Sequence, residues 1–192
     1  MERIAGVLSD VLVTKDVVEP EDRDFYRYAI ESLLIICINL FTMLGLAILI
    51  GKAVECLFFL MVFSPLRSHS GGLHMKTWYS CYFASCCLVE IVLLLSGKIV
   101  VGWGALLFIF ALCGLLIWFY RPCVNEKHPM KETDIRRNRV YVRVYCILLF
   151  VLAICLKVFG CEVLVMLCTS AIMLNAGLLV GECICFGDNK VT

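Results

Sequence analysis

Charged side chains are scarce in this chain. Of its 192 residues only 17% are Asp, Glu, Lys or Arg, while 62% are hydrophobic and the mean hydropathy is +0.95. A soluble domain carries about 25% charged residues and is about half apolar. The scarcity of charge therefore excludes a soluble globular domain and predicts an all-α, polytopic integral membrane protein. The length suits one membrane-embedded domain over residues 1–192.

Metal-ligand spacings are also lacking. The chain has thirteen Cys and three His, but no C-x-x-C and no H-E-x-x-H. Most cysteines lie inside apolar segments and their number is odd, which favours packing between helices over a disulfide framework. We therefore expect no metal and no other cofactor. The net charge of +1 gives no reason to expect nucleic-acid binding.

No cleavable signal peptide is expected, because acidic residues rather than a short apolar run follow Met1-Glu2-Arg3. Residues 1–28 are predicted to be a cytoplasmic or interfacial segment. Within it, residues 2–13 carry apolar side chains at helical spacing, namely Ile4, Val7, Leu8, Val11 and Leu12. We predict an amphipathic helix in the headgroup region, the alternative being a helix packed on the protein itself.

Six hydrophobic segments predict about six transmembrane helices. Five are of comparable length, at residues 32–50, 77–96, 99–120, 145–159 and 163–181. The first has nineteen uncharged residues, enough to cross about 30 Å of hydrocarbon. The remaining segment, 53–66, contains Glu55 and is expected to stop at Pro65. It would then reach only about 21 Å, as a short span or a re-entrant piece.

The distribution of basic residues favours six crossings. With the N-terminus in the cytoplasm, fourteen of the seventeen Lys and Arg lie inside, and only Lys52, Lys98 and Lys157 lie outside. If residues 53–66 did not cross, this positive-inside bias would largely vanish. We predict a multi-pass protein of the cell membrane with both termini at the cytoplasmic side.

One polar stretch between two hydrophobic segments carries the residues of a chemical site. It contains Arg67, Gly71, Gly72, His74 and Cys81. On one continuous helix His74 and Cys81 would be about 10.5 Å apart along the axis, too far for a hydrogen bond. The helix is therefore expected to begin between them, with Thr77 as its N-cap, so that His74 can fold back over the first turn.

These residues suggest a thiol nucleophile with its base. Cys81 would sit where the helix dipole favours negative charge, and His74 would take its proton. Gly71 and Gly72 leave backbone N–H groups that can face an oxyanion, and Arg67 can hold a carboxylate. From spacing alone, a solvated histidine is the simpler alternative. No third catalytic residue is evident.

Three polar residues inside apolar segments are assigned to packing. Glu90 is nine residues beyond Cys81, so it points to the opposite helix face. Asn39 and Asn175 are predicted to form hydrogen bonds between helices.

The pattern R-x4-G-x-H-x6-C formed by Arg67, Gly72, His74 and Cys81 resembles the AgrB (accessory gene regulator B) family, the integral membrane cysteine endopeptidases of Gram-positive quorum sensing. The likeness covers the whole chain. It implies an AgrD-type propeptide as substrate, with an amphipathic N-terminal helix, a central cysteine and an acidic tail. It also implies an acyl-enzyme thioester on Cys81, release of a cyclic thiolactone autoinducing peptide, and a homodimer. Other members close a lactone.

Residues 121–143 form a basic loop with net charge +4 without His128. Five of its cations are predicted to attract the acidic tail: Lys127, Lys131, Arg136, Arg137 and Arg139. The alternative is plain positive-inside topology. For the protein as a whole, the alternatives are a small peptide transporter or exporter and a structural or sensor protein. A transporter should carry several buried charges or matching halves, and only Glu90 lies deep.

Overall fold

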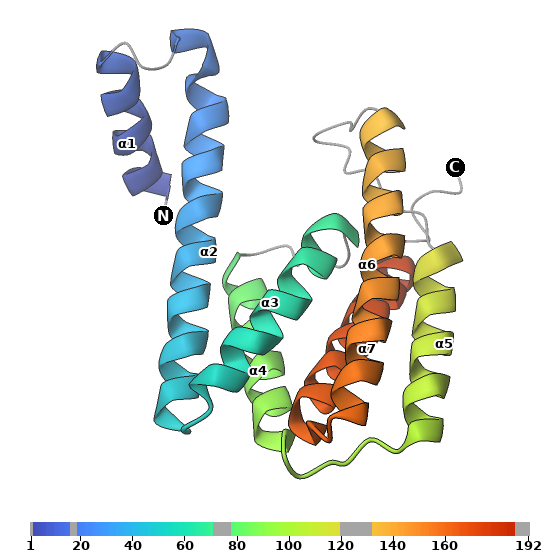
Figure 1. Ribbon diagram of the computed structural model, residues 1–192. Coiled ribbons are helices and arrows are strands. Elements are labelled where there is room, and N and C mark those ends of the chain that lie inside the picture. The colour runs from blue at the N-terminus through green and yellow to red at the C-terminus, as the bar shows by residue number, and fades with distance from the viewer. Residues whose placement is uncertain (1, 16–18, 71–77, 120–131, 187–192) are drawn as a thin grey trace.

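The computed structural model describes residues 2–15, 19–70, 78–119 and 132–186, and every secondary-structure element in these ranges is a helix, with no strand (Figure 1). A helix α1 (Glu2–Thr14) and a 3₁₀ turn η1 (Pro20–Asp22) precede six longer helices. These are α2 (Arg23–Leu49), α3 (Ala53–Ser70), α4 (Trp78–Leu95), α5 (Trp103–Phe119), α6 (Glu132–Val158) and α7 (Glu162–Phe186).

Three of these helices are long and apolar enough to cross a membrane, within Arg23–Leu49, Arg136–Val158 and Glu162–Gly181, and α4 and α5 contain shorter apolar stretches. The prediction of an all-helical multi-pass membrane protein is confirmed, while the count of six spans stays a prediction. Successive helices from α2 to α7 alternate in direction (Figure 1). The end that holds the start of α2, the end of α3 and the starts of α4 and α6 is called the basic end below.

The opposite end of the bundle consists of three short connections. Each contains a glycine with positive φ, namely Gly51 at +71°, Gly97 at +82° and Gly160 at +74°. Only glycine adopts this conformation without strain, so the chain can reverse within a few residues. Lys52, Lys98 and Lys157, the three lysines predicted to lie outside, all belong to this end.

Helix α7 is the centre of the bundle. It packs against α3, α5 and α6, and 56% of its apolar stretch is buried, compared with 11% for α2. The greater burial of α7 explains why it is apolar all around, because a helix surrounded by other helices must be apolar on every face. Helix α2 instead packs against α1, α3 and α4 and leaves most of its surface exposed.

Helix α3 corrects the prediction that the second hydrophobic segment stops at Pro65. It continues through Pro65 to Ser70 and has eighteen residues, about 27 Å. Proline has no N–H, so the carbonyl of Met61 loses its helical donor. The hydroxyl of Tyr145 on α6 replaces it, donating to Met61 O at 3.3 Å and to Val62 O at 3.1 Å. A tertiary contact thus allows the helix to pass the proline.

Helix α1 forms as predicted and lies antiparallel to the first half of α2 (Figure 1). Ala5 and Ser9 are its buried residues, whereas Ile4, Val7 and Leu8 stay exposed. The amphipathic stripe therefore does not face the bundle, and its place at the membrane interface stays a prediction. The Arg23 side chain donates a hydrogen bond of 2.6 Å to Asp10, which lowers the pKa of that carboxyl below its ordinary value.

Candidate active site

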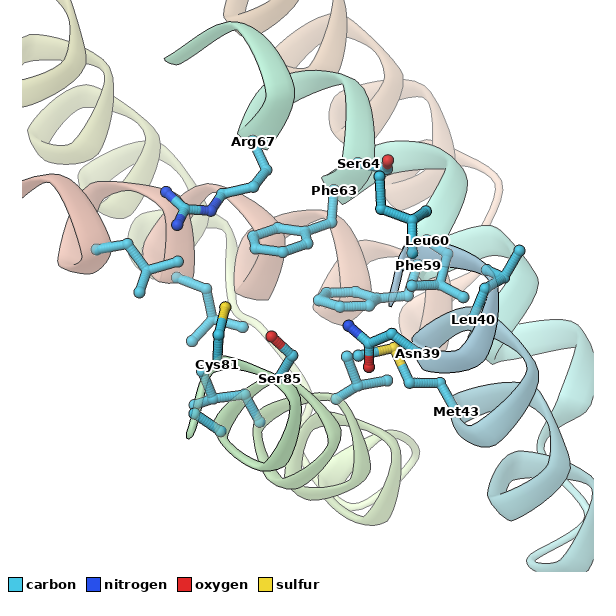
Figure 2. Close-up of a pocket in the computed structure, with 16 residues that line it drawn as sticks. Asn39, Leu40, Met43, Phe59, Leu60, Phe63, Ser64, Arg67, Cys81 and Ser85 are labelled. Atoms are coloured by element: carbon cyan, nitrogen blue, oxygen red, sulfur yellow. The ribbon is translucent and has the colours of Figure 1, made fainter. Parts of the chain in front are cut away.

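A cavity of about 300 Å³ opens between α2, α3, α4 and α7, and Figure 2 shows the side chains that line it. This volume is at the lower end of the range for small-molecule pockets. Most of its lining is apolar. The polar members are Asn39 from α2, Ser64 and Arg67 from α3, and Cys81 and Ser85 from α4.

Cys81 lies where the sequence predicted, in the first turn of a helix. Helix α4 begins at Trp78, so Cys81 is its fourth residue, and its side chain is half-buried. Backbone N–H groups in a first turn lack helical acceptors, and the helix dipole stabilises negative charge nearby. Thr77, the predicted N-cap, lies outside the described residues.

Arg67 reaches the same cavity from α3, because that helix continues beyond Pro65. Its guanidinium and the Cys81 sulfur extend from different helices toward one end of the cavity (Figure 2). The structure thus brings together two of the predicted site residues that lie fourteen positions apart. His74, Gly71 and Gly72 fall in 71–77, outside the described residues, so the predicted Cys81–His74 pair stays a prediction.

The last residue of α3 is fixed to the central helix. The Ser70 hydroxyl donates a hydrogen bond of 2.8 Å to Oδ1 of Asn175, and the two side chains are 4% and 0% exposed. The prediction of Asn175 as an interhelical hydrogen-bonding residue is confirmed. Its Nδ2 is buried without an acceptor among the described residues. Ser70 directly precedes the segment that contains His74, and this contact fixes it to α7, the helix that supplies Leu174 and Leu178 to the cavity.

Polar contacts between α2 and α4 fix the opposite wall. The Cys86 thiol donates to Oδ1 of Asn39 at 3.4 Å, and the Tyr82 hydroxyl donates to the Thr42 hydroxyl at 2.9 Å. Asn39 therefore forms the predicted interhelical contact and also lines the cavity. Glu90 does not line the cavity, and its Oε1 is buried without a partner within the part of the chain that is described.

Sequence reasoning missed the rest of the cavity wall. Phe59 and Phe63 stack at 5.4 Å between ring centroids and line the cavity, as does Ser85. Steps of four residues lead from Arg67 back to Phe63 and Phe59, and from Cys81 forward to Ser85. Residues four apart share a helix face, so this spacing would have identified them.

The predicted tail-binding residues differ in surroundings. Lys127 and Lys131 lie outside the described residues, Arg136 and Arg137 are exposed at the start of α6, and Arg139 is half-buried. The basic residues at the start of α6 lie at the same end of the bundle as Cys81 (Figure 1). Among the described residues, no three His, Cys, Asp or Glu side chains are close enough to hold a metal ion.

Comparison with known proteins places this sequence in a family. The family model for accessory gene regulator B matches residues 1–182. A putative AgrB-like protein of Clostridium beijerinckii is 29% identical over 110 residues, which cover 55% of this chain and 54% of the relative. The chain thus spans about half the length of the curated relative it matches. No solved structure matches. On the strength of the match over residues 1–182, the chain belongs to the AgrB family.

Proposed function

We propose that this protein is a membrane cysteine endopeptidase that removes the C-terminal tail of an AgrD-type propeptide and closes a thiolactone ring. The observation that carries this proposal is the shared cavity of Arg67 and Cys81, which places a thiol at a helix start beside a cation in a largely apolar chamber. Membership of the family supports the processing of an autoinducing peptide.

The first step forms the acyl-enzyme. His74 takes the thiol proton, the Cys81 sulfur attacks the scissile carbonyl carbon, and the C–N bond breaks as His74 returns the proton to the leaving amine. Backbone N–H groups of Gly71 and Gly72 stabilise the intermediate oxyanion. Arg67 holds a carboxylate of the peptide or the developing charge. The products are a thioester on Cys81 and a free tail.

The second step closes the ring. The thiolate of the central cysteine in the peptide attacks the thioester carbonyl, and the C–S bond to Cys81 breaks, which restores the enzyme thiolate. One thioester replaces another, so little bond energy is lost, provided that water is kept away. The apolar walls supplied by Phe59, Phe63 and Leu178 suit that requirement.

The basic residues at the start of α6 are proposed to attract the acidic tail. Arg136 and Arg137 are exposed near the start of α6, which lies at the basic end (Figure 1). We place this end, with both termini, at the cytoplasmic face, since Lys52, Lys98 and Lys157 are the only basic residues at the other end among those that the structure describes. Residues 1–192 would act as one domain, and a homodimer is proposed from the family resemblance.

The test uses purified protein in liposomes, an acidic-tailed AgrD-type peptide and mass spectrometry. Wild type should release the tail and yield a peptide lighter by one water than the hydrolysed fragment. Cys81→Ala and His74→Ala should abolish both products. Cys87→Ala is the matched control, because Cys87 is exposed on the same helix, and it should retain activity. Cleavage by Cys81→Ala protein would refute the proposal.

A second experiment tests the tail contact. Charge reversal of Arg136 and Arg137 should raise KM for the acidic-tailed peptide several-fold at low salt, with less effect at high salt because ions screen exposed charges. A peptide with a neutral tail is the control and should show no change. Equal KM values for wild type and variant at low salt would remove these residues from the substrate site.

A further inference from the structure

A second cavity, of about 430 Å³, lies between α5 and α6 with α7 as its floor. It shares no residue with the cavity of Cys81. Its lining is apolar except at one end: Leu107, Phe110, Ala111, Gly114 and Trp118 from α5, Arg143, Cys146, Ile147 and Phe150 from α6, and Ile172 from α7. This groove is called the α5–α6 groove below.

The α5–α6 groove has the length of one membrane leaflet. Its residues on α5 run from Leu107 to Trp118, eleven positions or about 16 Å, and the hydrocarbon of one leaflet is about 15 Å thick. Gly114 lies between these two residues, and a Cβ placed there would meet no atom within 4 Å. The groove is therefore open beside Gly114, and its length suits an extended acyl chain.

The polar end of the groove lies at the basic end of the bundle. The Arg143 guanidinium lies over the Trp118 ring, 4.3 Å from its centroid, and its Nη2 donates to Trp118 O at 3.1 Å. Trp118 is the residue before the last one of α5, and a tryptophan at the end of a membrane-spanning helix is typical of the headgroup level. The cation is therefore held where the polar and apolar parts of a lipid meet.

One N–H group of this cation still lacks a hydrogen-bond acceptor. Nε of Arg143 is buried with no partner in the described residues, and the same holds for Nε of Arg139, one turn earlier on the same face of α6. A buried N–H without an acceptor is costly, and more so when the group is charged. An anionic oxygen from a bound molecule would supply the missing acceptor.

We propose that the α5–α6 groove binds one anionic phospholipid, with its phosphate on Arg143 and one acyl chain along α5 past Gly114. An anionic headgroup is favoured over choline or ethanolamine because the neighbouring guanidinium groups of Arg139 and Arg143 would repel the ammonium group of those two headgroups. Phosphatidylglycerol has the required chemistry. This site involves none of the residues assigned to peptide processing except Arg139, which the lipid would share with the tail.

Native mass spectrometry of the full-length protein tests this proposal. The purified protein is mixed with equal amounts of dioleoyl phosphatidylglycerol and dioleoyl phosphatidylcholine. Wild type should retain one phosphatidylglycerol in preference to phosphatidylcholine. Arg143→Gln should retain roughly tenfold less, as expected for loss of a charge-assisted hydrogen bond. Arg137→Gln, a control on a different face of α6, should bind as wild type does.

Gly114→Leu tests the acyl-chain half of the groove. The new side chain would occupy open space, so the fold should persist, as checked by circular dichroism, while retention of both lipids should fall. Equal losses in Arg143→Gln and Arg137→Gln would overturn the proposal in favour of unspecific attraction to the basic end. Unchanged lipid retention with a shifted monomer–dimer ratio would overturn it in favour of a second copy of the chain in the groove.

Discussion

The passage of α3 through Pro65 leads to a quantitative prediction. If the Tyr145 hydroxyl substitutes for the missing helical donor, then Tyr145→Phe should leave the Met61 carbonyl without a hydrogen-bond donor. Hydrogen bonds between membrane helices contribute on average about 0.6 and at most about 1.7 kcal/mol. Because one hydroxyl serves both Met61 O and Val62 O, we expect a loss of about 1 kcal/mol in the free energy of unfolding.

The expected loss depends on the proline. In Pro65→Ala protein, the new N–H at position 65 can donate to Met61 O, so the hydroxyl becomes largely dispensable. Tyr145→Phe should then cost less than about 0.5 kcal/mol, and the double-mutant cycle should give a positive coupling. Tyr141→Phe is the matched control. Tyr141 is exposed one turn away, and its hydroxyl has no hydrogen bond within the described ranges.

The assay is equilibrium unfolding in mixed dodecyl maltoside and sodium dodecyl sulfate micelles, followed by circular dichroism. For a chain of this size, 1 kcal/mol also corresponds to about 2–4 °C in Tm. Equal losses from Tyr145→Phe in the wild-type and Pro65→Ala backgrounds would refute the reasoning. The hydroxyl would then stabilise the bundle by some route other than relief of the proline.

Three further predictions concern the two ends of the bundle. Asn175→Ala removes the hydrogen-bond acceptor of the Ser70 hydroxyl, so it should lower kcat for peptide processing several-fold. The reactivity of Cys81 toward a thiol-alkylating reagent should change little. A parallel loss of that reactivity would indicate general unfolding. Asp10→Asn should increase hydrogen exchange in α1 at neutral pH. The folded-state pKa of Asp10 is lowered, so its stabilisation is present above about pH 4 and disappears as the pH falls through that lower value, where variant and wild type should converge. Lys52→Met leaves the carbonyls of Leu93 and Ser96 at the end of α4 without the hydrogen bonds from Lys52, so it should lower Tm by a few degrees. Lys98→Met is the control, because Lys98 is exposed, and it should leave Tm unchanged. Equal shifts in Tm would contradict the role of Lys52 in capping α4.

Several features of the site were accessible to sequence reasoning because they depend on local rules. A helix start between His74 and Cys81 follows from the distance that a continuous helix would impose, and α4 indeed begins at Trp78. Asn175 was assigned to an interhelical hydrogen bond because an amide inside an apolar helix needs a partner. Neither argument required knowledge of which helices are neighbours.

The prediction for α3 failed because a proline was judged by its local cost alone. The hydroxyl that offsets this cost comes from Tyr145, eighty positions later, and no local pattern points to it. The consequence reaches the site, since the extra turns of α3 carry Arg67 to the cavity and Ser70 to Asn175. The cavity wall of Phe59 and Phe63, by contrast, could have been found from the sequence, because both share a helix face with Arg67.

The sequence by itself determined that the chain is a membrane protein, that its secondary structure is helical and which residues are available for chemistry. Hydropathy, helix periodicity and motif spacing settle these points because each acts over a few helical turns. Only the tertiary structure decided that α7 is central, that α3 passes its proline, and that Arg67 and Cys81 face one cavity while Arg143 faces another groove. These outcomes depend on which helices pack together, and packing depends on side chains that are distant in the sequence.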